Sequence, residues 1–315
     1  MKKSIFTLLV VALAAPMMFN SCKGGGGDDP TPTPSDLPVP PKAAQAVKVI
    51  INPPSNKPTY DYPASFEYTE TGKGIVGFKA VTVPLSAPVK SEDSSVIYYI
   101  TGTATQIGNV FTLVGPDGKT YKFEVTGSGT QAQIKFINPD GQTLDLTGTL
   151  QAIKVTNQFF TNLCRSWSII KTRVSIVAEG VNAAAEWPNA TSSAACDLNE
   201  IEKFASDYYK ITDKLPQGMN VTSVDISNRG TYNISFANKT EYVGEWTSAL
   251  SNGFNYSWKT DDMGFQLENG KAGFEFVVDG GVTYCIMTLS AIIKDGNKNY
   301  DTKVFCTMKE PAMYY

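Results

Sequence analysis

Residues 109–127 read NVFTLVGPDGKTYKFEVTG, two β-rich runs on either side of the dipeptide Asp117-Gly118. Asp-Gly between two such runs is a strong signal for a β-hairpin. In residues 121–125, YKFEV, apolar side chains alternate with charged ones, so the strand would bury one face and expose the other. A second turn of the same kind, NPDGQT at 138–143, begins 23 positions after GPDGKT at 115–120. The stretch therefore predicts antiparallel strands joined by short turns.

The same pattern continues on both sides of this stretch and covers residues 45–153. Runs such as VIYYITGTAT at 96–105 and AQIKFIN at 132–138 are rich in β-branched and aromatic residues. Residues 84–96, PLSAPVKSEDSSV, interrupt the pattern and are predicted to form a loop. We expect an N-terminal antiparallel β domain over 45–153, a meander of strands that is closed or folded over on itself.

Residues 157–315 are predicted to form a second β domain with one or two short helices. Apolar residues recur at helical spacing over 157–167, and Asp197 followed by Glu200 is typical of a helix N-cap. Residues 180–196, GVNAAAEWPNATSSAAC, carry little charge and are predicted to form a loop. The remainder reads as eight short strands between Gly, Asn and Asp turns, which favours an up-and-down antiparallel barrel. The fold class we expect is all-β.

The composition of the 315-residue chain argues against several classes of function. Its 27 basic and 30 acidic residues give a net charge of −3, without the basic patch that binding to nucleic acid requires. The chain has no histidine, which removes the commonest general base and the commonest metal ligand. No C-x-x-C spacing suggests a zinc site, and no carboxylate pair stands out. We therefore expect no enzyme activity, no metal and no cofactor.

A short apolar segment stands at the start of the chain. Two lysines precede an apolar run, 5–15, which is shorter than the roughly 20 residues of a membrane-spanning helix but fits a secretory signal. The sequence FNSC then ends at Cys22 and resembles the relaxed lipobox of Bacteroidetes lipoproteins, in which the cysteine becomes the lipidated N-terminus. Residues 1–21 are predicted to be a lipoprotein signal peptide. The alternative is an ordinary signal peptide followed by a chance cysteine.

The segment after Cys22 cannot bury a core. Residues 22–44 contain four consecutive glycines and the sequence DDPTPTPSDLPVPP, which favour flexible and extended chain. We predict a lipidated tether that holds the folded part off a membrane. The expected location is the bacterial outer membrane, lipid-anchored at the cell surface, with a periplasm-facing anchor as the alternative.

Four further cysteines, at 164, 196, 285 and 306, permit two disulfides in an exported protein. If Asp295-Gly296 forms the centre of a type I′ hairpin, the register places Cys285 opposite Cys306. A bulge of one residue would shift this register. The two readings that remain are a Cys285–Cys306 bridge and a pair of buried free thiols.

Three motifs in the second half resemble the small lipocalin-like domains of Bacteroidetes lipoproteins. They are TNLCRSWSIIKTRV at 161–174, CDLNEIEKF at 196–204, and GTYNISF with VGEWT at 230–236 and 243–247. The resemblance covers roughly residues 157–310. It implies an eight-stranded barrel whose base is plugged by a tryptophan beside a basic residue. Trp167 and Arg165 stand near that place in this sequence, and a G-x-W occurs again at Gly244-Glu245-Trp246.

A barrel of eight strands is about wide enough to be filled by side chains or to hold one small ligand. The large aromatic residues of the second domain either fill the interior or line a pocket, and the candidates for lining it are Trp246, Tyr256 and Trp258. Trp187, in the predicted loop, is a candidate for an exposed platform that binds a sugar ring. The expected function is a non-catalytic, membrane-anchored module that binds a small apolar ligand or a glycan. The alternative is a structural or assembly component of an outer-membrane complex without a small ligand.

Overall fold

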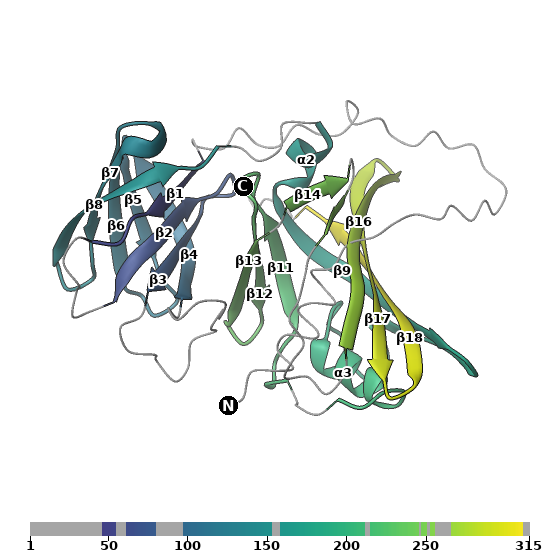
Figure 1. The fold of residues 1–315 in the computed structure, drawn as a ribbon. Helices are drawn as coiled ribbons and strands as arrows, with labels where there is room; N and C mark the ends of the chain where they lie inside the picture. The colour runs from purple at the N-terminus through teal and green to yellow at the C-terminus, as the bar shows by residue number, and fades with distance from the viewer. Residues whose placement is uncertain are drawn as a thin grey trace. The chain divides into compact units, whose positions relative to one another are not determined.

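The computed structural model describes residues 46–54, 61–79, 97–152, 158–211, 215–245, 247–250, 253–255 and 266–310. The chain divides into two compact units. One unit is Val39–Lys154 together with Ser227–Arg229, and the other contains Val155–Ile226 and Gly230–Tyr315. Both are built from antiparallel strands, which confirms the all-β fold class (Figure 1). The predicted signal peptide, Cys22 and the tether lie outside the described residues.

The first unit is a closed antiparallel barrel in which each strand pairs with the next along the chain (Figure 1). Pairing of the first strand with the last, Val49 opposite Leu150, closes the cylinder. A closed meander was one of the two forms predicted for this region. A 3-10 turn, Gly129–Gln131, precedes the seventh strand. The strands are β1 (Val47–Ile51), β2 (Tyr62–Tyr68), β3 (Lys73–Lys79), β4 (Ile97–Ile107), β5 (Val110–Val114), β6 (Thr120–Thr126), β7 (Ala132–Ile137) and β8 (Thr143–Leu150).

The alternation of apolar and charged residues in the sequence matches the alternation of buried and exposed side chains in this barrel. Tyr121 and Phe123 of β6 are buried, whereas Lys122 and Glu124 between them are exposed. The inward side chains fill the cylinder as a single aromatic-rich core. At its centre the rings of Phe66 and Phe123 stack with centroids 4.2 Å apart, and neither side chain is exposed to solvent. A small barrel can be filled in this way because its interior is only a few side chains wide.

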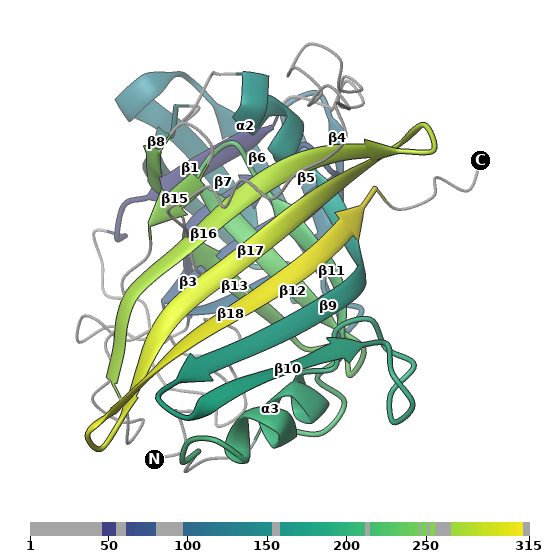
Figure 2. The same cartoon turned by 90° about the vertical axis from the view of Figure 1, so that its right-hand side faces the viewer.

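The second unit is one large antiparallel sheet with two short helices. Its strands follow the order β13-β12-β11-β9-β18-β17-β16-β15-β14, with β10 paired to β9. Figure 2 shows β16, β17, β18, β9 and β10 side by side, with α3 beside β10. The elements are α2 (Gln158–Leu163), β9 (Ser166–Ala178), β10 (Val181–Trp187), α3 (Leu198–Ser206), β11 (Val221–Ile226), β12 (Thr231–Phe236), β13 (Glu241–Glu245), β14 (Thr247–Leu250), β15 (Gly253–Asn255), β16 (Gln266–Asp279), β17 (Val282–Asp295) and β18 (Lys298–Lys309).

This order is that of an up-and-down meander in which β9, the first strand, pairs with both β11 and the last strand, β18. The prediction was a closed barrel over 157–315. In the part of the chain that the structure describes, the pairing runs from an edge at β13 to an edge at β14, and no pairing joins those two strands. The two edge strands are consecutive in the chain and are separated by Trp246, which lies outside the described residues.

Two local predictions in this unit are wrong. Residues 181–187, predicted to belong to a loop, form β10, because a hairpin at Gly180 brings them against β9 in register. One of the breaks between the eight predicted strands falls after Asn269, but Asn269-Gly270 lies inside the single strand β16. The register with β17 shifts there between Glu268 and Lys271, so the chain absorbs the turn-forming dipeptide as a β-bulge.

The helix predicted from Asp197 is confirmed. The Asp197 side chain accepts hydrogen bonds from the backbone N–H groups of Asn199 and Glu200, which satisfies two of the donors at the N-terminus of α3. Leu198, Ile201 and Ala205 are buried along one face, as the apolar spacing predicts. The other helix, α2, is shorter than the run of residues with helical spacing that predicted it.

Candidate functional site

A pocket of about 170 Å³ opens at one end of the barrel of the first unit. It combines four aromatic rings with charged and amide side chains. Its lining residues are Phe78, Tyr98, Tyr121 and Phe136, with Asp61, Lys119, Asn138, Pro139 and Asp140. They come from the end of β3, the starts of β4 and β6, the end of β7 and the connecting turns, which all lie at the same end of the cylinder because successive strands alternate in direction.

The two repeated Asp-Gly turns both contribute to this end. Gly118 and Gly141 adopt positive φ angles of 76° and 81°, which glycine reaches without strain. In the second turn the Asn138 side chain accepts hydrogen bonds from the backbone of Asp140 and Gln142, at 3.1 and 2.8 Å. The spacing of 23 positions between the turns thus corresponds to two consecutive antiparallel strands, β6 and β7, which return the chain to the same rim of the barrel.

The aromatic rings form one packed group beneath the polar rim. Phe78 stacks on Tyr98 with ring centroids 5.3 Å apart and contacts Phe136 edge-on at 6.0 Å. Tyr121 lies parallel to Phe136 at 6.5 Å. Phe78, Tyr121 and Phe136 are buried, so these rings are held in place by the barrel core. A rigid aromatic surface of this kind offers contact area at little cost in conformational entropy.

The polar groups at the rim can donate and accept hydrogen bonds. The Tyr98 hydroxyl donates to Asp61 Oδ2 at 2.9 Å. Burial, followed by the contact with Asp61, raises the pKa of Tyr98, and burial together with the charges of Asp117 and Asp140 raises the pKa of Tyr121 to about 12. Both phenols therefore stay protonated at neutral pH. They can orient a ligand by hydrogen bonds but do not supply a nucleophile or a base.

No metal centre accompanies this pocket within the described ranges, where no group of three or more His, Cys, Asp or Glu side chains is placed to hold an ion. The ion pair at the rim, Lys119 Nζ to Asp117 Oδ2 at 3.6 Å, is solvent-exposed on both sides and contributes little to stability. A pocket whose floor is aromatic and whose rim carries carboxylate, amide and ammonium groups is suited to a ligand that has an apolar ring face and polar substituents at its edge.

The sequence did not single out this pocket. The repeat of the two turns was visible, but the return of both turns to one rim beside Tyr98 and Phe78 depends on the closed cylinder. The predicted ligand-lining residues of the second domain, Trp246, Tyr256 and Trp258, lie outside the described residues, and their predicted role stays a prediction. Trp187 is not an exposed platform, because its side chain is only 2% exposed and belongs to the core of the second unit.

The register predicted for Cys285 and Cys306 is wrong. The β17–β18 hairpin places Asp295 opposite Lys298, so Gly296 and Asn297 form the turn and Cys285 faces Met308. Gly296 has φ +58°, as the first central position of a type II′ turn requires. Cys306 faces Met287 instead of Cys285, and the structure holds both cysteines as buried free thiols.

Trp167 and Arg165, the pair to which the lipocalin resemblance points, lie together in the second unit. Trp167 is 1% exposed, and its indole N–H donates to the carbonyl of Leu163 at 2.9 Å. The Arg165 guanidinium lies 5.6 Å from the centroid of the Trp167 ring and pairs with the carboxylate of Glu310. The cation therefore stacks on the aromatic ring while a carboxylate neutralises its charge.

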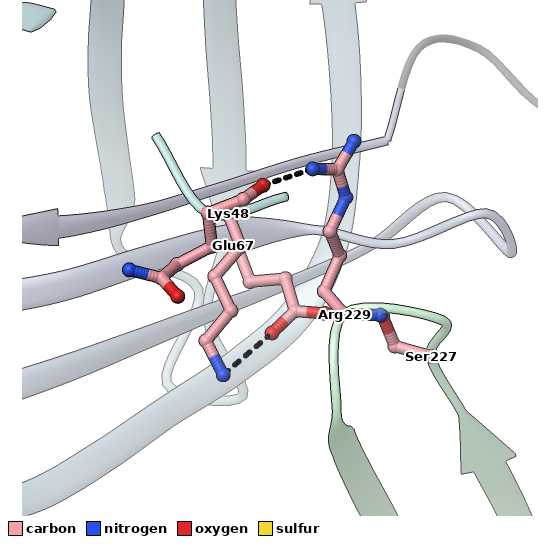
Figure 3. Close-up of polar contacts among 5 residues, drawn as sticks. Lys48, Glu67, Ser227 and Arg229 are labelled. Carbon is pink, nitrogen blue, oxygen red and sulfur yellow. Dashed lines mark hydrogen bonds and ion pairs between the residues drawn. The ribbon is translucent and has the colours of Figure 1, made fainter. Parts of the chain in front are cut away.

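A second group of charged side chains belongs to the first unit (Figure 3). Lys48 and Glu67, on paired strands β1 and β2, are almost fully buried and form an ion pair at 3.6 Å. The turn Ser227–Arg229, which is part of this compact unit, brings the Arg229 guanidinium to the main chain of the barrel. Its carbonyl acceptors are those of Ala46 and Gln151.

Glu70 lies beside these charges in the β2–β3 turn. Both of its carboxylate oxygens are buried. Burial, the largest cause, and the negative charge of Glu67 raise the pKa of Glu70 to about 7, although backbone hydrogen bonds from Glu70 itself and from Asn228 and the charge of Arg229 act in the opposite direction. This carboxyl group therefore titrates near neutral pH. Since β2 and β3 run from this turn to Asp61 and Phe78, Glu70 lies at the end of the barrel remote from the pocket.

Comparisons with known proteins identify no relative. No family model matches the chain, and neither a curated protein nor a solved structure is significantly similar to it. Among the described residues, no helix has the length and apolar character needed to cross a bilayer.

Proposed function

We propose that this protein is a non-catalytic binding module, anchored to a bacterial envelope by a lipid on Cys22, that binds a glycan in the pocket of its first barrel. The observation that supports the ligand class is the combination of four aromatic rings with the carboxylates of Asp61 and Asp140 and the amide of Asn138. An aromatic ring covers the apolar face of a sugar ring, while carboxylates and amides bind its hydroxyl groups. A purely apolar ligand would form no hydrogen bonds with these polar groups.

The size of the pocket limits the proposal further. Sites for drug-sized molecules usually enclose roughly 300–1,000 Å³, whereas this pocket encloses about 170 Å³. The pocket is therefore suited to a single sugar unit of a glycan, with the remainder of the chain outside the barrel. The high pKa values of Tyr98 and Tyr121 support binding over catalysis, because both phenols remain protonated.

Replacing Tyr98 by phenylalanine is expected to weaken glycan binding about tenfold. The substitution keeps the ring that stacks on Phe78 but removes the hydroxyl that donates to Asp61. A hydrogen bond between this hydroxyl and a sugar hydroxyl is worth about 1–1.5 kcal/mol, which corresponds to a factor of about ten in affinity. The measurement is to screen the full chain on a glycan array and then to titrate the best oligosaccharide by calorimetry.

The matched control is Tyr68→Phe, because Tyr68 lies in the same barrel at the other end of β2 and its side chain is buried, more deeply than that of Tyr98. This variant should bind the oligosaccharide as the unsubstituted chain does. Absence of any bound glycan, or the same affinity in both variants, contradicts the proposed ligand class. A chain that binds no glycan but co-purifies stably with envelope proteins would favour the assembly role.

The proposed anchor predicts a lipid on Cys22. Treating the producing bacterium with globomycin is expected to accumulate the unprocessed precursor, because cleavage before a lipidated cysteine depends on lipoprotein signal peptidase. In untreated cells the mature chain should partition into the detergent phase of Triton X-114, and a Cys22→Ser chain should not. A mature chain that remains in the aqueous phase with an unmodified or missing Cys22 refutes the anchor.

A further inference from the structure

Two of the buried cysteines come from distant parts of the second unit. Cys306 lies in β18, directly opposite Thr172 of β9. Cys196 stands immediately before Asp197, the N-cap of α3, and its carbonyl accepts a hydrogen bond from Val221 N at 2.9 Å. Both cysteine side chains are 0% exposed and belong to the same core. The fold thus brings together two thiols that are 110 positions apart in the sequence.

The side chains of these two cysteines meet at the hydroxyl of Thr172. The Thr172 hydroxyl donates to Cys306 Sγ at 3.8 Å, and the threonine is also fully buried. The Cys196 thiol is in hydrogen-bond contact with both Cys306 and Thr172. The contact with Cys306, followed by burial, raises the pKa of Cys196, while the contact with Thr172 acts in the opposite direction. A thiol in such a place is unreactive once the protein has folded, so any oxidation has to occur while the chain folds.

We propose that Cys196 and Cys306 are joined by a disulfide in the mature protein, because the two thiols are fully buried in one core, where they contact each other and Thr172. The thiolate of one cysteine attacks the disulfide of a thiol oxidoreductase or of oxidised glutathione and forms a mixed disulfide. The second cysteine then displaces the carrier thiol. The Cys196–Cys306 bond forms at the cost of two S–H bonds, and the two electrons and two protons reduce the carrier disulfide to two thiols.

This pairing excludes the Cys285–Cys306 bridge considered from the sequence, since Cys306 can form only one bond. It would fasten the entry of α3 to the last strand of the sheet. By closing a loop of about 110 residues, the bond restricts the unfolded chain strongly. The inference rests on the proposed export of the chain to an oxidising compartment. It does not depend on the proposed glycan pocket, which belongs to the other unit.

Peptide mapping tests the bond directly. The full chain, carrying Cys22→Ser, is refolded in a buffer of reduced and oxidised glutathione. It is then denatured in the presence of iodoacetamide, which alkylates the free thiols, and digested with trypsin without reductant. Each core cysteine lies in its own tryptic peptide: 155–165, 174–203, 272–294 and 304–309. The expected result is a joined pair of 174–203 and 304–309 that separates on reduction. Alkylated Cys196 and Cys306, or Cys306 joined to 272–294, overturns the proposal.

A stability measurement gives a second readout. Reductant is expected to lower the thermal midpoint of the second unit by several degrees in the oxidised chain. The Cys196→Ala and Cys306→Ala double variant should show no such shift. The matched control is Cys164→Ala, which removes another buried cysteine and should keep the response to reductant. An oxidised chain whose midpoint is the same with and without reductant counts against the bond.

Discussion

Replacing Phe123 by alanine is expected to cost the first unit about 3–5 kcal/mol of its free energy of unfolding. Phe123 is 0% exposed and stacks on Phe66 with ring centroids 4.2 Å apart. Its ring centroid lies 4.9 Å from that of Phe136. Its removal deletes a large buried apolar surface and leaves a cavity. The closed ladder of hydrogen bonds holds the strands at fixed spacing, so the barrel cannot contract to fill that cavity.

The chain offers a convenient way to measure this effect. All four tryptophans, at 167, 187, 246 and 258, belong to the second unit, so their fluorescence reports only on that unit. Urea unfolding followed by far-ultraviolet circular dichroism reports on both units. Phe123→Ala should shift the dichroism transition of the barrel to lower urea and leave the fluorescence transition in place.

Ile107→Ala is the matched control, because Ile107 is in the same barrel but 81% exposed. Its effect should stay within about 0.5 kcal/mol. If Phe123→Ala and Ile107→Ala change stability equally, Phe123 does not pack in the barrel interior and the register of β6 is wrong.

Replacing Glu70 by glutamine is expected to remove a pH dependence of about 3 kcal/mol from the stability of the first unit. The pKa of Glu70 is about 7 in the folded protein, against an ordinary value of 4.5. The folded state holds the proton of Glu70 more tightly than the unfolded state does. The protonated carboxyl group therefore contributes its full stabilisation below pH 4.5, and this contribution is lost as the pH rises through 7. Each unit of pKa corresponds to about 1.4 kcal/mol.

Below pH 4.5 the Glu70→Gln variant and the unsubstituted chain should have similar stability, because both present a neutral side chain. At pH 8 the variant should be more stable by about 2–3 kcal/mol, because it avoids the cost of a buried carboxylate. The measurement is the urea midpoint of the barrel at several pH values between 4.5 and 8.

Glu124→Gln provides the control, since Glu124 is an exposed carboxylate of the same barrel. This variant should follow the pH profile of the unsubstituted chain. A Glu70→Gln profile with an unchanged slope, or lower stability than the unsubstituted chain at pH 8, would show that Glu70 is not held in a site that favours its neutral form.

The sequence predicted those features that depend on residues near one another in the chain. The alternation at 121–125 indicated which side chains of β6 are buried, because a strand places successive residues on opposite faces. Asp197 marked the start of α3, because a cap is formed with residues two and three positions later. The Asp-Gly turns at 115–120 and 138–143 were also visible, because glycine supplies the backbone angles that they need.

Tertiary structure alone decided where these local pieces meet. Asn269-Gly270 became a bulge and Gly296-Asn297 became the turn because pairing along the whole length of β17 outweighs the local preference of one dipeptide. The pocket joins residues from several strands, and the contact between Cys196 and Cys306 joins the entry of α3 to β18. Such neighbours are set by register and closure, in which the packing of many distant side chains acts together, and no short stretch of the chain carries that information.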